Sequence, residues 1–126
     1  MSHTALVIED DLSLAKAINK KLQLNGFETL TARSVDDALK LMEGAHPIGV
    51  IWLDHYLIGD KDGIAFAATI KAHDGWQHIP IYVVSNTASN DKVMSYNKLG
   101  INHFYVKADH RLDEIIADIK AQINPE

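Results

Sequence analysis

Short apolar runs alternate along the chain with longer segments in which apolar residues recur every three or four positions. The short runs are rich in Val and Ile and predict strands at 5–8, 27–31, 48–53, 79–84 and 104–106. The run at 48–53 is apolar throughout and is expected at the centre of a sheet, whereas the more polar run at 27–31 is expected near an edge. The longer segments predict helices that bury one face, at about 12–24, 35–43, 64–73, 90–99 and 112–123. This alternation predicts an α/β fold, with a parallel sheet covered by helices on both faces.

Capping residues support the predicted helix boundaries. Asn25 and Gly26 follow the first helix in the way that a left-handed C-terminal cap would. Ser34 is a good N-cap for the second helix, and Asn90 or Asp91 is expected to cap the fourth.

The composition is that of an ordinary globular protein. With 126 residues, 47% of them hydrophobic and 23% charged, the chain fits a single domain over residues 1–126. A net charge of -5 argues against direct binding to nucleic acid, because phosphate backbones require clustered Lys and Arg. Cys is absent, so no disulfide can form. The apolar runs are too short to span a bilayer and no signal peptide precedes the first strand, so we expect no membrane partner and a cytoplasmic location.

Polar residues follow four of the predicted strands at their carboxyl ends. They are Glu9, Asp10, Asp11, Asp54, Ser85 and Lys107. In an open parallel sheet these strand ends face one crevice, in which ligands bind. We therefore expect the side chains to converge on one site. Ser85 alone is a weak signal, because serines often begin loops, and Lys107 is a stronger one, although a surface lysine is an alternative.

The three consecutive acids, Glu9, Asp10 and Asp11, have two interpretations. One of them is expected to cap the first helix, where a carboxylate stabilises the helix dipole. A cap needs a single carboxylate, and the excess suits Mg²⁺, which prefers oxygen ligands and usually takes one or two carboxylates from a protein. The cluster therefore predicts a magnesium site.

Asp54 is the residue that most clearly indicates chemistry. It ends an apolar strand and has no evident capping role, because the next predicted helix begins only after Gly63. Aspartate nucleophiles that form acyl phosphates are an established chemistry. The charges of a carboxylate and a phosphoryl group repel each other, by about 4 kcal/mol at about 4 Å and an effective dielectric constant of about 20. A cation beside Asp54 would offset this repulsion.

Other functional classes find little support. The Gly-x-Ser-x-Gly elbow of serine hydrolases is absent, as are the Walker loop and the Gly-x-Gly-x-x-Gly motif that bind nucleotides. The seven His residues show no zinc-type spacing, and most are expected to face solvent.

Taken in order, these residues resemble the receiver domain of two-component response regulators over essentially the whole chain. The matching motifs are Leu-Val-Ile-Glu-Asp-Asp at 6–11, Asp54, Asp-Gly at 62–63, Val-Val-Ser at 83–85 and Phe-Tyr-Val-Lys at 104–107. Each motif is weak by itself, but their order and spacing make the match specific. The resemblance implies a flavodoxin-like, doubly wound (βα)5 fold with strand order 2-1-3-4-5.

The resemblance also implies the chemistry at the acceptor. Asp54 would take a phosphoryl group from a sensor histidine kinase or a histidine phosphotransfer protein. Mg²⁺ would be bound by Asp10 directly, by Glu9 largely through water, by Asp54, and by the backbone carbonyl of Tyr56. The domain would catalyse its own phosphorylation and dephosphorylation, as a signalling phosphoacceptor rather than an enzyme.

Signal output would depend on Ser85, Lys107 and Phe104. Lys107 would pair with Asp54 at rest and with the phosphoryl oxygens after modification. Ser85 and Phe104 would be the switch residues: Ser85 would hydrogen-bond a phosphoryl oxygen, and Phe104 would then pack inward. A downstream protein would bind the face formed by the fourth helix, fifth strand and fifth helix. Candidates on this face are Val93, Tyr96, Phe104 and Asp109.

The chain departs from the family pattern around the acceptor, which leaves two rival functions open. Leu57 and Ile58 replace the usual Met-Pro, the Asp-Gly pair lies one residue further on, and Ala108 replaces the usual Pro. A receiver-like interaction module that acts without phosphorylation is one rival, but degenerate receivers usually lose an acid, the aspartate or the lysine. A metal-dependent phosphatase is the other, but it would be expected to carry a carboxylate where this chain has Tyr56. We therefore predict a phosphorylation-dependent switch.

Overall fold

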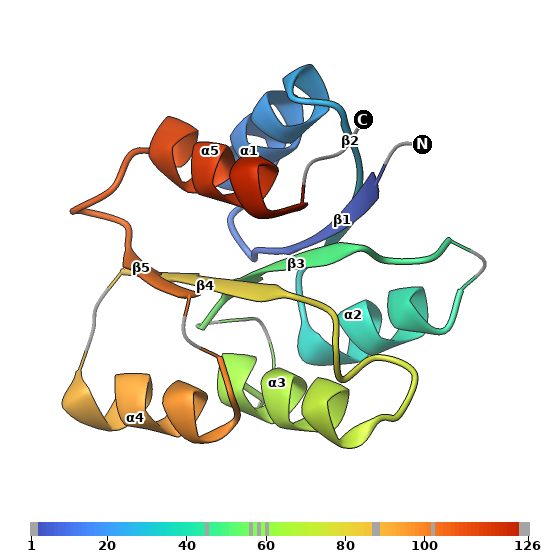
Figure 1. The fold of residues 1–126 in the computed structure, drawn as a ribbon, viewed down its shortest axis with the longest axis vertical. Coiled ribbons are helices and arrows are strands. Elements are labelled where there is room, and N and C mark those ends of the chain that lie inside the picture. The colour runs from blue at the N-terminus through green and yellow to red at the C-terminus, as the bar shows by residue number, and fades with distance from the viewer. Residues whose placement is uncertain are drawn as a thin grey trace.

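The computed structural model describes residues 3–44, 46–55, 57, 59, 61–86, 89–101 and 103–123, and within these ranges strands and helices alternate (Figure 1). The strands are β1 (His3–Ile8), β2 (Phe27–Ala32), β3 (Val50–Asp54), β4 (Ile81–Ser85) and β5 (His103–Val106). The helices are α1 (Leu12–Leu24), α2 (Val35–Met42), α3 (Gly63–Ala72), α4 (Asn90–Lys98) and α5 (Leu112–Ile123). The predicted alternation is confirmed.

The strands form a parallel sheet in the order β2-β1-β3-β4-β5. Helices α1 and α5 cover one face, and α2, α3 and α4 cover the other (Figure 1). This is the predicted flavodoxin-like fold, with the apolar β3 at the centre and the more polar β2 at an edge. No helix within the described ranges is both long enough and apolar enough to cross a lipid bilayer.

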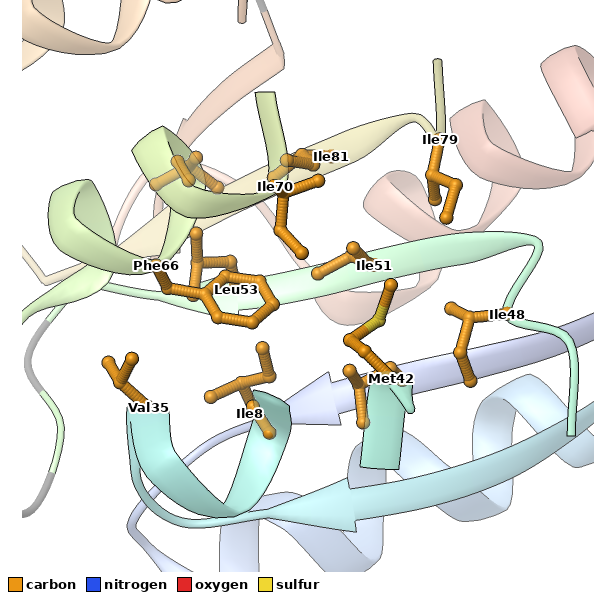
Figure 2. Packing of buried hydrophobic residues seen from close by; sticks show 14 of the residues in the cluster. Ile8, Val35, Met42, Ile48, Ile51, Leu53, Phe66, Ile70, Ile79 and Ile81 are labelled. Carbon is orange, nitrogen blue, oxygen red and sulfur yellow. The ribbon is translucent and has the colours of Figure 1, made fainter. Parts of the chain in front are cut away.

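The apolar core lies on both faces of the sheet, because alternate residues of a strand point to opposite sides. Leu6 and Ile8 of β1 belong to a cluster that packs against α2 and α3 (Figure 2), whereas Ala5 and Val7 belong to a cluster that packs against α1 and α5. Strands β3 and β4 divide in the same way, and all of their residues are buried. Polar side chains are therefore placed at the strand ends, and this positions the site.

Two strands begin later than the apolar pattern predicts. β3 begins at Val50 rather than Ile48, and β4 begins at Ile81 rather than Ile79. Ile48 and Ile79 are nevertheless buried, because the core extends beyond the hydrogen-bonded ladder. Pro80 also has no N–H with which to extend β4.

The helix caps follow the sequence signals except at α4. Ser34 caps α2 through its hydroxyl, and Gly26 has the positive φ of 94° expected after α1. The N-cap of α4 is Ser89, so the prediction of Asn90 or Asp91 is wrong. The backbone of Ser89 is extended, with φ of -90° and ψ of 153°, whereas Asn90 is already helical.

Gly63 is the first residue of α3 and lies against the end of β3. Its N–H donates to the carbonyl oxygen of His55 at 2.9 Å. A Cβ atom at this position would overlap the hydroxyl of Tyr96 and would lie 3.1 Å from both the carbonyl oxygen of Asp54 and the Cα atom of His55. Because backbone atoms cannot move aside as a flexible side chain can, this close approach requires glycine.

Replacing Gly63 by Ala should lower the free energy of unfolding by about 1–3 kcal/mol, the usual cost of overpacking a well-packed interior. Urea denaturation followed by circular dichroism would measure the change. Gly75→Ala is the control, because a Cβ atom there would approach only the ring of the exposed His73. Equal losses in the two variants would show that the contacts around Gly63 do not restrict its size.

Candidate functional site

The strand ends meet at the carboxyl edge of the sheet. Glu9 follows β1, Asp54 ends β3, Ser85 ends β4 and Lys107 follows β5. The Nζ atom of Lys107 lies 3.2 Å from Oε1 of Glu9 and 3.7 Å from Oδ2 of Asp54. Lys107 therefore contacts Asp54 at rest and lies closer still to Glu9, a contact that the sequence did not indicate.

Glu9, Asp10 and Asp54 form an acidic cluster. Each offers a carboxylate oxygen, and these oxygens lie within 4.8 Å of one another. Glu9 and Asp54 are 1% and 3% exposed, whereas Asp10 is half-buried. Asp11 has a different role, because its Oδ1 accepts a hydrogen bond from the backbone N–H of Leu14 at 3.1 Å and so caps α1. The capping interpretation is thus confirmed for Asp11, and Glu9 and Asp10 contribute to the acidic cluster.

Positive charge nearby compensates these carboxylates only in part. Burial raises the pKa of Glu9 from 4.5 to about 7, and the negative charge of Asp54 acts in the same direction. Lys107 opposes this shift without cancelling it. An open cleft of about 460 Å³ lies beside the cluster. The uncompensated negative charge and the hard oxygen ligands fit a divalent cation such as Mg²⁺, which Glu9, Asp10 and Asp54 could hold.

Ser85 is fully buried and is hydrogen-bonded to a lysine that sequence patterns did not reveal. The Nζ atom of Lys92, near the start of α4, donates to Oγ of Ser85 at 3.3 Å. Lys92 is itself buried, with 7% of its surface exposed. Its spacing of four residues from Tyr96, on the same face of α4, is the signal that could have indicated an inward orientation.

His55 is an exception to the expectation that most histidines face solvent. It is buried, and its Nδ1 lies 3.0 Å from the hydroxyl oxygen of Tyr96, within hydrogen-bonding distance. Burial is the main cause that lowers the pKa of His55, so the imidazole is neutral at neutral pH. Burial likewise raises the pKa of the Tyr96 hydroxyl. A hydrogen bond between neutral groups thus joins the residue after Asp54 to α4.

The four residues predicted on the output face differ in how far they are buried. Phe104 is partly buried, and its ring centroid lies 5.8 Å from that of Tyr96. Val93 is partly buried and Asp109 is exposed. Tyr96 is fully buried, so its prediction as a surface contact is wrong. Its hydroxyl is held at His55, and this contact turns the ring into the core.

Tyr56, which the sequence singled out as a metal ligand, lies outside the described residues. The predicted carbonyl ligand from Tyr56 is therefore a sequence-based expectation. Leu57, which replaces the usual Met, is partly buried against the core. There is no cis peptide bond among the described residues, so the bond between Lys107 and Ala108 is trans.

Comparison with known proteins agrees with this arrangement. The family model described as "Response regulator receiver domain" matches residues 5–120. The transcriptional regulatory protein KdpE of Mycobacterium tuberculosis is 31% identical over 119 residues, which cover 94% of this chain and 50% of KdpE. The swarming motility regulation protein RssB of Serratia marcescens is 31% identical over 117 residues, which cover 92% of this chain and 51% of RssB. The chain thus spans about half the length of these relatives.

A solved structure supports the fold. The chemotaxis protein CheY4 of Vibrio cholerae matches with a TM-score of 0.84 and 20% sequence identity, over 98% of this chain and 99% of that one. At this identity the likeness concerns the fold alone.

Without a divalent cation, the protein should become less stable as the pH rises from about 4.5 to about 7. Glu9 binds its proton more tightly in the folded protein than in the unfolded chain, so folding is favoured where that proton is retained. The loss should reach about 3.5 kcal/mol at most, since one pKa unit corresponds to about 1.4 kcal/mol. Urea unfolding in EDTA at a series of pH values would measure it.

Glu9→Gln removes this titration and isolates it from that of other groups. The variant should be more stable than the wild type at pH 8 and nearly equal to it at pH 4. Glu43→Gln, at an exposed glutamate that ends α2, is the matched control and should follow the wild-type curve. Parallel curves for Glu9→Gln and the wild type would contradict the raised pKa.

Proposed function

The chain belongs to the response regulator receiver domain family, and we propose that it is a phosphorylation-dependent switch of two-component signalling with Asp54 as its phosphoacceptor. The observation that carries the proposal is the position of Asp54. Its buried carboxylate belongs to the acidic cluster and lies 3.7 Å from the ammonium group of Lys107. A nucleophile for an anionic phosphoryl group needs a neighbouring cationic group, here Lys107, together with access from a cleft.

In the proposed transfer, a carboxylate oxygen of Asp54 attacks the phosphorus atom of a phosphohistidine. The P–N bond breaks, and the imidazole nitrogen that leaves takes up a proton from water. The donor would be a sensor histidine kinase or a histidine phosphotransfer protein. The acyl phosphate on Asp54 then adds negative charge to the cleft, and the surrounding groups have to stabilise it.

We assign this stabilisation to Lys107, Ser85 and the acidic cluster. Lys107 would pair with the phosphoryl oxygens as a point charge, and the hydroxyl of Ser85 would donate to one of them. Bound Mg²⁺, held by Glu9, Asp10 and Asp54, would supply charge neutralisation between donor and acceptor. The same groups would support hydrolysis of the acyl phosphate, which resets the switch.

Output is proposed to pass through the face formed by α4, β5 and α5. Val93, Phe104 and Asp109 are candidate contacts there, and a change in the packing of Phe104 would alter the surface that a downstream protein binds. A cytoplasmic location, a single receiver domain over residues 1–126 and the absence of direct contact with nucleic acid belong to the same proposal.

Incubation with acetyl phosphate and Mg²⁺ should add one phosphoryl group, which intact mass spectrometry would detect and hydroxylamine would remove. Asp54→Asn should abolish the modification, because an amide is not a nucleophile for phosphorus. Asp74→Asn, at an exposed aspartate beyond the end of α3, should be modified like the wild type. Labelling of Asp54→Asn at full yield would place the acceptor elsewhere.

Lys107→Ala should retain the native circular dichroism spectrum but bind beryllofluoride at least about tenfold more weakly in Mg²⁺, because a hydrogen bond to a charged group contributes about 1.5–3 kcal/mol. Amide NMR signals of Ser85 and Phe104 would report binding. Lys120→Ala, at an exposed lysine of α5, is the control.

Comparison of the wild type, Lys107→Ala and Lys120→Ala distinguishes the rival functions. Equal responses in all of them would show that Lys107 does not serve the phosphoryl group. An absence of response in the wild type would favour an interaction module that works without phosphorylation.

A further inference from the structure

A second lysine, besides Lys107, contacts a residue of the proposed phosphoryl site. Lys92 extends from α4, and its Nζ atom donates to Oγ of Ser85 at 3.3 Å. The side chain is buried, which is unusual for lysine and requires a compensating interaction. Ser85 is one partner of the Lys92 ammonium group. The proposed function assigns Ser85 a contact with the phosphoryl group.

The direction of this hydrogen bond is fixed by chemistry. An ammonium group has three donors and no acceptor, whereas a serine hydroxyl has one donor and can also accept. Oγ of Ser85 must therefore accept from Lys92, and the hydroxyl proton of Ser85 is directed to another partner. Hydrogen bonds in a chain polarise one another, so accepting from a cation makes the hydroxyl a stronger donor.

Sheet geometry places that donor beside the acceptor aspartate. Ser85 is the last residue of β4, and its neighbour Val84 is paired in register with Asp54 on β3. Lys92 thus reaches Ser85 from α4, at the end of β4 that lies next to Asp54.

We propose that Lys92 is a positioning residue of the phosphoryl site, which holds the Ser85 hydroxyl as an acceptor toward α4 and so directs its proton to a phosphoryl oxygen. The proposal rests on the proposed function of Asp54. It assigns α4 a part in recognising the phosphoryl group. Lys92 acts through the Ser85 hydroxyl and does not itself contact that group.

The test measures beryllofluoride affinity in Mg²⁺ by amide NMR for a set of variants. Lys92→Met keeps an apolar stem and removes the ammonium group. Its affinity should fall by up to about tenfold, because the Ser85 hydroxyl loses the cation that orients and polarises it and so bonds the charged beryllofluoride group less well. Lys98→Met removes the same charge from an exposed position on the same helix, and its affinity should stay within about twofold of the wild type.

A double-mutant cycle with Ser85→Ala tests whether Lys92 acts through the hydroxyl. In the Ser85→Ala background, Lys92→Met should change the affinity by less than about twofold. Lys92→Gln is the second neutral variant, to be used if Lys92→Met does not fold, and it should also bind more weakly than the wild type. Urea unfolding of each variant separates stability from affinity.

The outcomes are distinct. Lower stability of Lys92→Met with wild-type affinity for beryllofluoride would make Lys92 a structural anchor of α4 and overturn the proposal. If Lys92→Met lowered the affinity about tenfold in the Ser85→Ala background as well, the proposal would also be overturned, because Lys92 would then act independently of the hydroxyl. No binding to the wild type would overturn the proposed function itself, which the first two outcomes leave intact.

Discussion

The site depends on one buried ionic network, in which the ammonium group of Lys107 lies between the carboxylates of Glu9 and Asp54. Taking these charges out of water costs about as much as their attraction returns, so the network adds little to stability. Its effect is on the charge state: Glu9 and Asp54 are held close together and remain under-compensated, as the raised pKa of Glu9 shows. A divalent cation bound at this cluster would offset the remaining negative charge.

The sheet concentrates this chemistry at one edge and connects it to α4. Because β3 and β4 are buried on both faces, functional side chains emerge at their carboxyl ends. Two residues of α4, one helical turn apart, reach these ends: Lys92 bonds to Ser85 at the end of β4, and Tyr96 to His55 just after β3. Tyr96 also packs against Phe104. Helix α4, which is part of the proposed output face, is thus attached to the site by polar contacts as well as by apolar packing.

The sequence predicted most of this architecture, for reasons that are local. Alternating strand and helix patterns gave the fold, and the polar residues at strand ends gave Glu9, Asp10, Asp54, Ser85 and Lys107 as neighbours. The ends of the ladder were less predictable, because burial of Ile48 and Ile79 continues beyond the hydrogen bonds. Such positions look the same in sequence as paired ones.

The contacts of α4 were not predicted, because each depends on a partner from another element. The helix is largely polar, so its inward face carries no apolar stripe to mark it. Lysine, histidine and tyrosine each favour the surface unless a specific acceptor or donor compensates for burial. Lys92 has a partner in Ser85, and His55 and Tyr96 are partners of each other. The spacing of Lys92 and Tyr96 could indicate that both point inward, but it does not identify these partners.

The close contact between Gly63 and the hydroxyl of Tyr96 also has an evolutionary consequence. A side chain at position 63 would need both a smaller or outward-turned residue at position 96 and a shift of the backbone at the end of β3. Losing Tyr96 in turn leaves the buried imidazole of His55 without its hydrogen bond. Homologues should therefore vary at positions 55, 63 and 96 in concert, with the change at 96 preceding the change at 63 along any viable lineage.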